Sequence, residues 1–218
     1  MEEVINRTKG WVREKLKHDT TGHDWAHIRR VYNHAIYLAS KEGGQLPVIQ
    51  LAALLHDIVD DKLVKDVDAA YIELTDWLHS QLLPESMIIH ILDIIKNMSF
   101  KGGSGSFMQT IEGKIVQDAD RLDAIGAIGI ARTFMYAGAV GHAMYKENVS
   151  VRETMTEEEY RNGSSTAIQH FYEKLLKLTE LMNTQTAKKL AQERHDYMEQ
   201  FLTQFMKEWK NDYENVDG

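Results

Sequence analysis

The fold is decided by the stretch Leu51-Ala52-Ala53-Leu54-Leu55-His56-Asp57-Ile58-Val59-Asp60-Asp61, where an apolar run gives way to one histidine and three carboxylates. Burying a charged group without a partner costs several kcal/mol even after the protein relaxes. A His-Asp pair this close to a buried run therefore needs a compensating cation. We expect that cation to be a metal ion.

The composition predicts an all-α protein. The 218 residues include only 2 Pro, and Ala, Leu, Ile, Lys, Glu and Met are abundant, which is typical of helices. A chain of this length can bury a substantial core as one domain, so we expect a single domain over residues 1–218.

Charge and cysteine content narrow the functional classes. The chain has no Cys, so a metal must be held by His, Asp or Glu. A formal net charge of -8 argues against binding to nucleic acid polymers or anionic membranes. The amino terminus lacks the apolar segment of a signal peptide, and residues 124–144 are too interrupted for a span of about 20 apolar residues. We expect a cytoplasmic protein.

Apolar periodicity and punctuation by Gly and Pro predict eight helices. The third, with Pro47 in its first turn, is apolar around nearly its whole circumference and should be central. The Gly-rich segment 99–106 is expected to be a flexible loop. The predicted helices cover about residues 2–17, 24–42, 47–58, 69–82, 84–97, 113–136, 165–182 and 186–209, with a metal-binding core at about 20–136 and the last two helices packed on it.

Four residues form the candidate metal site. His27 lies on the second predicted helix, His56 and Asp57 end the third, and Asp120 lies within the long helix over 113–136. Two neutral imidazoles and two carboxylates around a divalent ion make a nearly neutral set that a partly dry pocket can hold. Each fragment alone is commonplace, whereas this order of fragments on apolar helices is much more specific.

Here the sequence resembles the HD-domain family of metal-dependent phosphohydrolases, and in particular its small bacterial single-domain members. The resembling segments are residues 23–31, 51–57, 97–102, 118–128 and 170–175, together with Arg194. The resemblance implies an HD-type helical bundle with extra C-terminal helices and metal ligands at His27, His56, Asp57 and Asp120. It further implies hydrolysis of nucleoside or deoxynucleoside triphosphates to the monophosphate and pyrophosphate. Manganese is the favoured ion, with Mg, Fe, Co or Ni as alternatives.

The expected mechanism follows from those ligands. Four protein groups leave coordination positions open, and a water bound there loses a proton more easily than free water and could attack phosphorus. Asp60 and Asp61 are candidates for orienting that water or moving its proton, as acidic residues do in related family members.

Phosphate and substrate contacts are assigned to nearby basic residues. Arg30, Lys62 and Lys101 are the main candidates for holding phosphates, with Lys101 on the Gly-rich loop, and Arg121 is a further candidate. His23 lies one helical turn before His27 and could contact substrate or water.

Several alternatives stay open at this stage. Asp123 shares much of the face of Asp120 one turn further on, whereas Asp118 points about 160° away and could form hydrogen bonds elsewhere. Some members of the family that this sequence resembles hold a second metal with two further histidines. Here only His79 and His90 lie in the corresponding interval, and Pro84 places them on different helices, so one metal is expected. Aromatic residues and Met in the last two helices are expected to form core or homodimer contacts rather than a ligand box.

The function could also differ within and beyond the enzyme class. The same metal site would serve a nucleotide phosphomonoesterase or phosphodiesterase. A non-catalytic helical module that senses nucleotides is disfavoured, because all four ligand positions and both neighbouring acidic residues are present.

Overall fold

The computed structural model describes residues 1–17, 19, 22–61, 63–98, 108–147, 151–152 and 165–211, and in these ranges all regular structure is helical. The all-α prediction is therefore confirmed. The elements are α1 (Glu2–Lys15), α2 (Trp25–Glu42), α3 (Leu46–Leu55), α4 (Val67–Ser80), α5 (Glu85–Asn97), α6 (Ile111–Asp123), α7 (Gly126–Ala139), α9 (Ala167–Glu173), the 3-10 helix η2 (Leu175–Leu178) and α10 (Gln185–Trp209).

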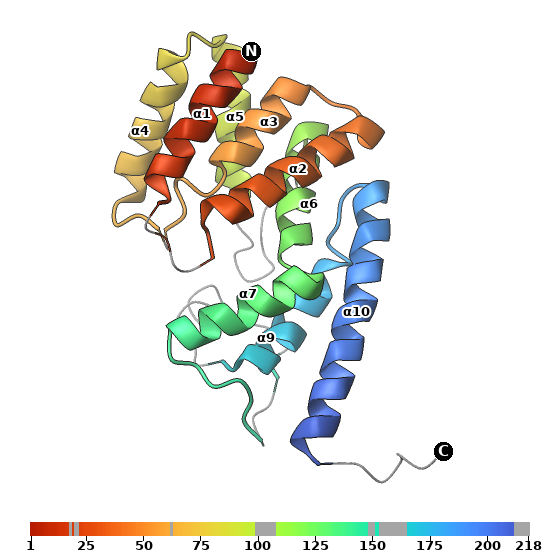
Figure 1. Cartoon of the computed structure of the whole chain (residues 1–218). Helices are drawn as coiled ribbons and strands as arrows, with labels where there is room; N and C mark the ends of the chain where they lie inside the picture. Colours follow the sequence, from red (N-terminus) through yellow and green to blue (C-terminus); the bar gives the residue numbers. More distant parts are fainter. Residues whose placement is uncertain are drawn as a thin grey trace.

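The helices form two groups. Figure 1 shows α1 to α6 in an upper group and α7 and α9 in a lower group, with α10 running alongside both and the two termini at opposite ends of the molecule. No helix in the described ranges is long and apolar enough to cross a membrane.

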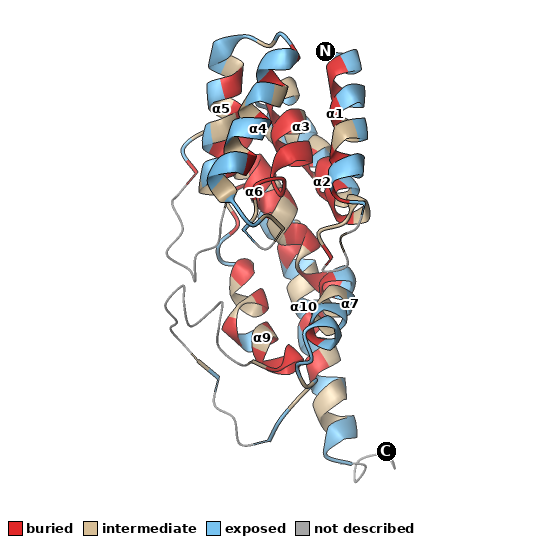
Figure 2. Ribbon diagram, turned by 90° about the vertical axis from the view of Figure 1, so that its left-hand side faces the viewer, coloured by how far each residue is buried: buried red, intermediate tan, exposed pale blue. Residues whose placement is uncertain are grey.

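Helix α3 is the centre of the upper group, as the sequence predicts. It begins with Pro in its first turn, and all five residues of the run 51–55 are 0% exposed. Neighbours α1, α2, α5 and α6 surround it, which explains why nearly its whole circumference is apolar. Figure 2 shows this burial along α3, while the outer faces of α4 and α5 are exposed.

The end of α3 differs from its predicted end at Ile58. The helix stops at Leu55, and His56 and Asp57 lie in the turn that follows. Within this turn the amide of Ile58 donates to Leu55 O at 3.1 Å and the amide of Asp60 donates to Asp57 O at 3.0 Å. The polar residues therefore leave the helix at the end of its apolar run.

Helix α2 begins where the sequence predicts. Asp24 is its N-cap, and its carboxylate accepts from the amide of His27 at 2.9 Å. This is the expected way for Asp to satisfy a free amide in the first turn. The cap fixes His27 in the first turn of α2, whose inner face packs against α3 and α6.

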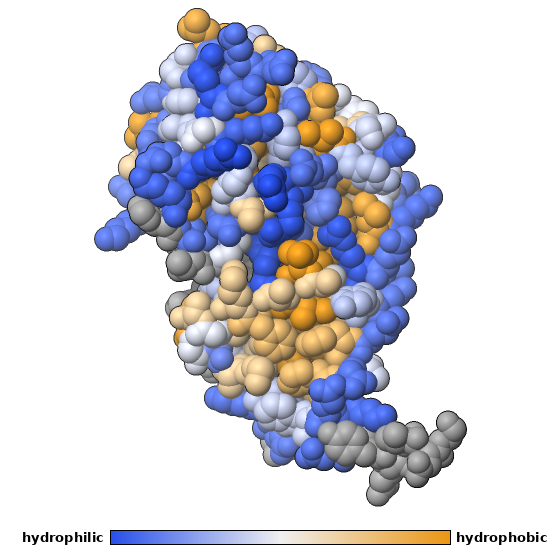
Figure 3. All heavy atoms as spheres, viewed as in Figure 1, coloured by the Kyte–Doolittle hydropathy of each residue, from blue (hydrophilic) through white to orange (hydrophobic). Residues whose placement is uncertain are grey.

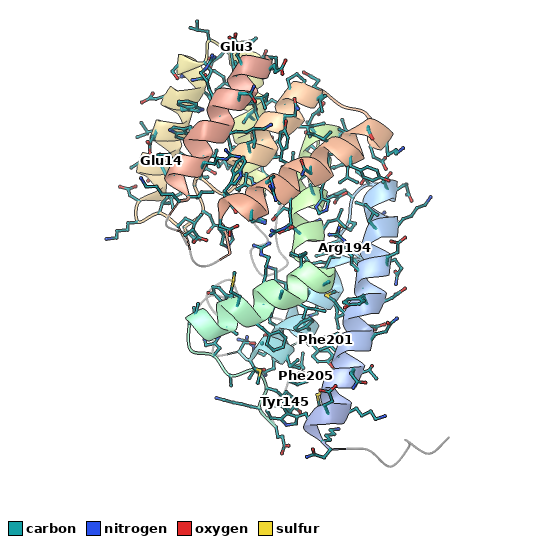
Figure 4. All side chains as sticks on the ribbon, viewed as in Figure 1. Glu3, Glu14, Tyr145, Arg194, Phe201 and Phe205 are labelled. Carbon is teal, nitrogen blue, oxygen red and sulfur yellow. The ribbon has the colours of Figure 1, made fainter. Side chains whose placement is uncertain are left out.

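The prediction of a single long helix over residues 113–136 is wrong. The chain forms α6 and α7 instead, with a break at Ala124 and Ile125. Gly126 opens α7 at φ +75°, a conformation that strongly favours glycine, and a Cβ there would lie 2.9 Å from Cγ of Arg194. Arg194 reaches into this corner from α10, as Figure 4 shows, and its guanidinium donates to Leu122 O. Close packing at the corner overrides the helical preference of the Ala-rich segment.

Aromatic side chains hold the lower group together. Phe201 of α10 contacts Phe134 of α7 and Phe171 of α9, with 5.9 Å between ring centroids in each pair. Phe205 and Tyr145 continue the cluster at 6.4 Å, and Figure 4 shows Phe201, Phe205 and Tyr145 along the lower part of α10. The helix predicted over 165–182 is shorter than expected, because α9 ends at Glu173 and η2 follows.

The outer surface of the lower group is apolar around α7. Figure 3 shows apolar side chains gathered there, and Ile128, Met135 and Val140 are 45%, 49% and 44% exposed. Arg132 is the single charged residue between Asp123 and Lys146. A lone charge in such a segment points to a specific contact elsewhere in the protein.

Asp118 ties α10 to α6. Its side chain is 0% exposed, and its Oδ1 accepts from the amide and the side-chain Nδ2 of Asn183 while its Oδ2 accepts from the amide and hydroxyl of Thr184. All four distances are 2.8 Å. Thr184 is itself the N-cap of α10. This carboxylate therefore fixes the start of the helix that runs along both groups.

We predict that Asp118→Ala lowers the free energy of unfolding by about 3–5 kcal/mol, because it leaves several buried donors without an acceptor. Urea denaturation followed by circular dichroism measures the change. Asp76→Ala removes a carboxylate from the exposed face of α4 and should change stability by less than about 0.5 kcal/mol. Equal effects of the two substitutions would contradict the anchoring role of Asp118.

Candidate metal centre

The four residues expected to bind metal lie close together, with the other three around Nε2 of His27. His27 comes from α2, His56 and Asp57 from the turn after α3, and Asp120 from α6. His27 Nε2 lies 3.3 Å from His56 Nε2, 3.2 Å from Asp57 Oδ2 and 3.6 Å from Asp120 Oδ1. His56 Nε2 lies 3.2 Å from Asp57 Oδ1 and 3.8 Å from Asp120 Oδ1.

These spacings fit a small divalent ion. Bonds of about 2.1 Å in octahedral geometry place neighbouring ligand atoms about 3 Å apart, and the separations given above are 3.2–3.8 Å. The nitrogen and oxygen donors suit Mn²⁺, Mg²⁺ and related ions. The side chain of Asp120 is 37% exposed, whereas those of the two histidines are 1–2% exposed. The cluster is therefore closed by the histidines and opens on the side of Asp120.

His56 is oriented by the backbone of α3. Its Nδ1 lies 3.0 Å from the carbonyl oxygen of Ala53. A carbonyl can only accept, so Nδ1 carries the hydrogen and the lone pair of Nε2 faces the cluster. The last turn of α3 thus orients the ring with Nε2 toward the cluster.

His27 is oriented by Asp123. Asp123 Oδ2 lies 2.7 Å from His27 Nδ1, on the opposite edge of the ring from the cluster. Arg30 donates from Nε to Asp123 Oδ1 at 2.6 Å and from Nη2 to Oδ2 at 3.0 Å, and Arg132 donates from Nη1 to Oδ2 at 2.7 Å. Asp123 therefore contacts His27 from behind, and Asp120 is the carboxylate of α6 that faces the cluster.

Buried charges shift the pKa values of this region. Burial would raise the pKa of Asp57, yet the three neighbouring histidines hold it well below its usual range. Burial would likewise raise the pKa of Asp123, but hydrogen bonds from His27 and Arg30 hold it far below normal. Burial would lower the pKa of His27, but its hydrogen bonds to Asp123 and Asp57 outweigh burial and raise the pKa to about 9.

His23 reaches the cluster from the loop before α2. Its Nδ1 lies 2.9 Å from Asp57 Oδ2, and its side chain is 17% exposed. The loop is organised by Asp19, whose Oδ2 accepts from the amides of Gly22 at 3.1 Å and His23 at 2.8 Å. Within the described residues, two overlapping groups could hold an ion, namely His23, His27 and Asp57, and His27, His56 and Asp120.

The remaining predicted site residues are placed as follows. Asp60 is half-buried and Asp61 exposed, both just beyond the His-Asp pair. Arg30 is engaged by Asp123, so a phosphate would meet only its remaining N–H donors. Lys62 and Lys101, together with the loop 99–106, lie outside the described residues.

Three other residues considered from the sequence lie in separate contacts. Arg121 donates to Leu181 O. Nε2 of His79 lies 3.0 Å from Oε2 of Glu85, and Nε2 of His90 lies 3.1 Å from Oγ1 of Thr110. Neither histidine belongs to the two groups able to hold an ion among the described residues.

Sequence reasoning missed Arg132 and the orienting contact of Asp123. Arg132 donates to Asp123 and also, from Nη2, to the carbonyl oxygen of Gly22 at 2.8 Å. The available signal was its isolation as the single charge in an otherwise apolar segment. A helical pattern alone could not show that the chain turns at Gly126 and brings this arginine back to the metal centre.

Comparisons with known proteins show which proteins this chain is similar to. The model of the HD domain family matches residues 24–125. A solved structure of a protein from Lactobacillus plantarum is 43% identical, with 97% of this chain and 99% of that chain covered and a TM-score of 0.88.

Two further structures carry more descriptive names. An HD-superfamily hydrolase from Bacillus thuringiensis is 48% identical, covers 96% of this chain and 98% of its own, and superposes with a TM-score of 0.76. Bacillus subtilis YpgQ in complex with ADP is 37% identical, covers 98% of this chain and 100% of its own, and has a TM-score of 0.74.

We predict that divalent ions bind more tightly as the pH rises. In the metal-free protein the ring of His27 stays protonated until the pH approaches about 9, so an ion must displace that proton. Because this pKa is raised from 6.5, the proton stabilises the metal-free fold below pH 6.5, and this contribution is lost toward pH 9.

Calorimetric titration of metal-stripped protein with Mn²⁺ measures the effect. Affinity should increase by up to about tenfold per pH unit between pH 6.5 and about 9. Over the same pH range, the melting temperature of the metal-free protein should fall. The increase in melting temperature on adding Mn²⁺ should become larger. An affinity independent of pH would contradict the protonated state of His27.

Proposed function

This chain belongs to the HD domain family of metal-dependent phosphohydrolases, and we propose that it hydrolyses nucleoside or deoxynucleoside triphosphates to the monophosphate and pyrophosphate. The observation that carries the proposal is the cluster of His56, Asp57 and Asp120 within 3.2–3.6 Å of His27 Nε2, which is open to solvent at Asp120. We further propose His27, His56, Asp57 and Asp120 as the ligands of one divalent ion, with Mn²⁺ favoured. A cytoplasmic location accords with a nucleotide substrate.

A nucleotide substrate is supported by a relative and by the local charges. YpgQ has been crystallised with ADP, and it matches this chain over almost its whole length. The formal net charge of -8 does not favour an anionic ligand, so recognition must be local. The ion and the free donors of Arg30 would provide positive charge at the centre, and Lys62 and Lys101 remain candidates for further phosphate contacts.

The protein groups divide the work in the proposed reaction. A bound divalent ion would polarise a phosphoryl oxygen and lower the pKa of a coordinated water. Asp57 and Asp120 supply the negative charge that holds the ion, and His56 is kept in the right tautomer by Ala53 O. Asp60 and Asp61 are placed just after the His-Asp pair, where a carboxylate could accept the proton of the attacking water. His23, beside Asp57 and partly exposed, is a candidate for contact with substrate.

The deciding experiment uses metal-stripped protein reloaded with Mn²⁺, Mg²⁺, Co²⁺ or Ni²⁺ and tested on a panel of nucleoside and deoxynucleoside triphosphates. We expect release of pyrophosphate, strongest with Mn²⁺, and no turnover by His56→Ala or Asp57→Ala. Release of orthophosphate instead would show cleavage of the terminal anhydride and would contradict release of pyrophosphate. Two results together would contradict an enzymatic function: no ion supports turnover, and both variants bind nucleotide as well as wild type does. They would favour a module that senses nucleotides.

We predict that Asp60→Asn or Asp61→Asn lowers kcat at least about tenfold, because general acid-base groups contribute about 10²–10⁴-fold to rates. Affinity for Mn²⁺ should stay unchanged, since neither residue belongs to the proposed ligands. Asp68→Asn, on an exposed residue of the first turn of α4, is the matched control and should leave kcat unchanged. A proton role for these residues fails if both variants keep the wild-type kcat.

A further inference from the structure

Arg132 is the point at which the lower group of helices touches the metal centre. From the middle of α7, its Nη1 donates to Asp123 Oδ2 at 2.7 Å and its Nη2 donates to Gly22 O at 2.8 Å. Nη1 also lies 3.0 Å from His27 Nδ1. One side chain of α7 thus reaches the loop before α2, the first turn of α2 and the end of α6.

The contact with His27 passes through Asp123. Arg132 Nη1 and His27 Nδ1 both lie 2.7 Å from the same carboxylate oxygen, so each donates a hydrogen to it. Their own 3.0 Å separation follows from this shared acceptor, because two donors cannot hydrogen-bond to each other. With one hydrogen held on Nδ1, it is Nε2, facing the cluster, that offers a lone pair once the ring loses its other proton.

The contact with Gly22 bears on His23. Gly22 has φ +95°, and a Cβ on it would lie 3.2 Å from Cε of Met135 and 3.5 Å from Nε of Arg132. Glycine therefore allows the loop backbone to approach α7 closely. The next residue, His23, has its Nδ1 2.9 Å from Asp57.

We propose that Arg132 is a positioning residue of the metal centre. By donating to Asp123 and to Gly22 O at once, it sets the orientation of His27 and the position of His23. The inference rests on the proposed function in one respect, namely that His27 binds the ion. A planar guanidinium can direct two hydrogen bonds to two acceptors in a fixed geometry, whereas lysine places one compact charge on a flexible stem.

Arg30 provides a matched comparison within the same chain. It pairs with both oxygens of Asp123 from α2 itself, so it neutralises the carboxylate without joining the two groups of helices. If neutralisation of Asp123 were all that mattered, the two arginines would be equivalent. If positioning matters, Arg132 should have the larger effect on metal binding.

The first experiment is calorimetric titration of metal-stripped, full-length variants with Mn²⁺. Arg132→Gln should weaken the affinity by about 10–100-fold, the range typical of groups that orient metal ligands. Arg132→Lys should recover only part of the loss, because it keeps the charge and loses the fork. Arg30→Gln should stay within about threefold of wild type.

A second pair of variants perturbs the same contact from the loop. Gly22→Ala should weaken Mn²⁺ binding, because the added Cβ meets Met135 and Arg132. Gly43→Ala is its control, since Gly43 has a similar φ of +86° but nothing within 4 Å of an added Cβ. Both carry the same kind of backbone strain, and only the first should change metal affinity.

Nuclear magnetic resonance of the zinc-loaded protein gives a signature that general destabilisation would not produce. The Nδ1 hydrogen of His27 should give an exchange-protected imidazole signal in wild type and in Arg30→Gln, and it should broaden in Arg132→Gln. Thermal unfolding of the metal-free variants verifies that they fold. If Arg132→Gln does not fold, the Mn²⁺ affinities of Arg132→Lys and Gly22→Ala test the proposal instead.

The proposal is overturned if the Arg132 and Gly22 variants that fold bind Mn²⁺ within about threefold of wild type. An equal loss in Arg30→Gln would also overturn it, since neutralisation of Asp123 would then suffice. A wild-type protein that binds Mn²⁺ but hydrolyses no nucleotide would contradict the proposed function and leave the role of Arg132 standing. A wild-type protein that binds no ion would refute both.

Discussion

The structure depends on the neutralisation of two buried carboxylates on either side of one imidazole. Asp57 is 6% exposed and Asp123 is 1% exposed, and His27 lies between them with Nε2 toward the first and Nδ1 toward the second. A buried carboxylate without a positive or hydrogen-bonding partner would be very costly. Several helices meet where they do because they bring partners to these two groups.

The two carboxylates are satisfied in different ways, and this difference favours one side of His27 for the proposed ion. Asp123 is matched by Arg30 and Arg132, whose charges are permanent. Asp57 faces histidines, which can give up their protons, and Asp120 faces the same rings from the open side. Once the histidine rings are neutral, Asp57 and Asp120 together carry two negative charges. One divalent cation balances this charge. The arginines contact Asp123 on one side of His27, and the proposed ion would lie on the other side.

Local sequence rules predicted the parts of this arrangement that local chemistry controls. Neighbouring residues are enough to predict that Asp24 is an N-cap and that the run in α3 is apolar. They also predict that Asp118 and Asp120 point in different directions from α6. The meeting of His27 with His56 was expected from the family resemblance. The structure brings these residues within 3.3 Å of each other.

The parts that could not be predicted depend on packing between distant segments. The turn at Gly126 is required by Arg194, which lies far along the chain and fills the corner. The angle between Asp120 and Asp123 indicates a shared face of α6, but it cannot say which nitrogen of His27 each carboxylate will meet. We infer that Arg132, whose position is set by α7, makes that choice by holding Asp123 against Nδ1 of His27.

These contacts change the role of the C-terminal helices. The matched family region ends at residue 125, one residue before α7 begins. Asp118 fixes the start of α10, Arg194 of α10 then occupies the corner at Gly126, and the resulting direction of α7 places Arg132 against Asp123. Each step is a contact between a residue of the family region and one beyond it. The helices after residue 125 therefore belong to the structural support of His27, and a chain cut at the family boundary would lack one of the two arginines that neutralise Asp123.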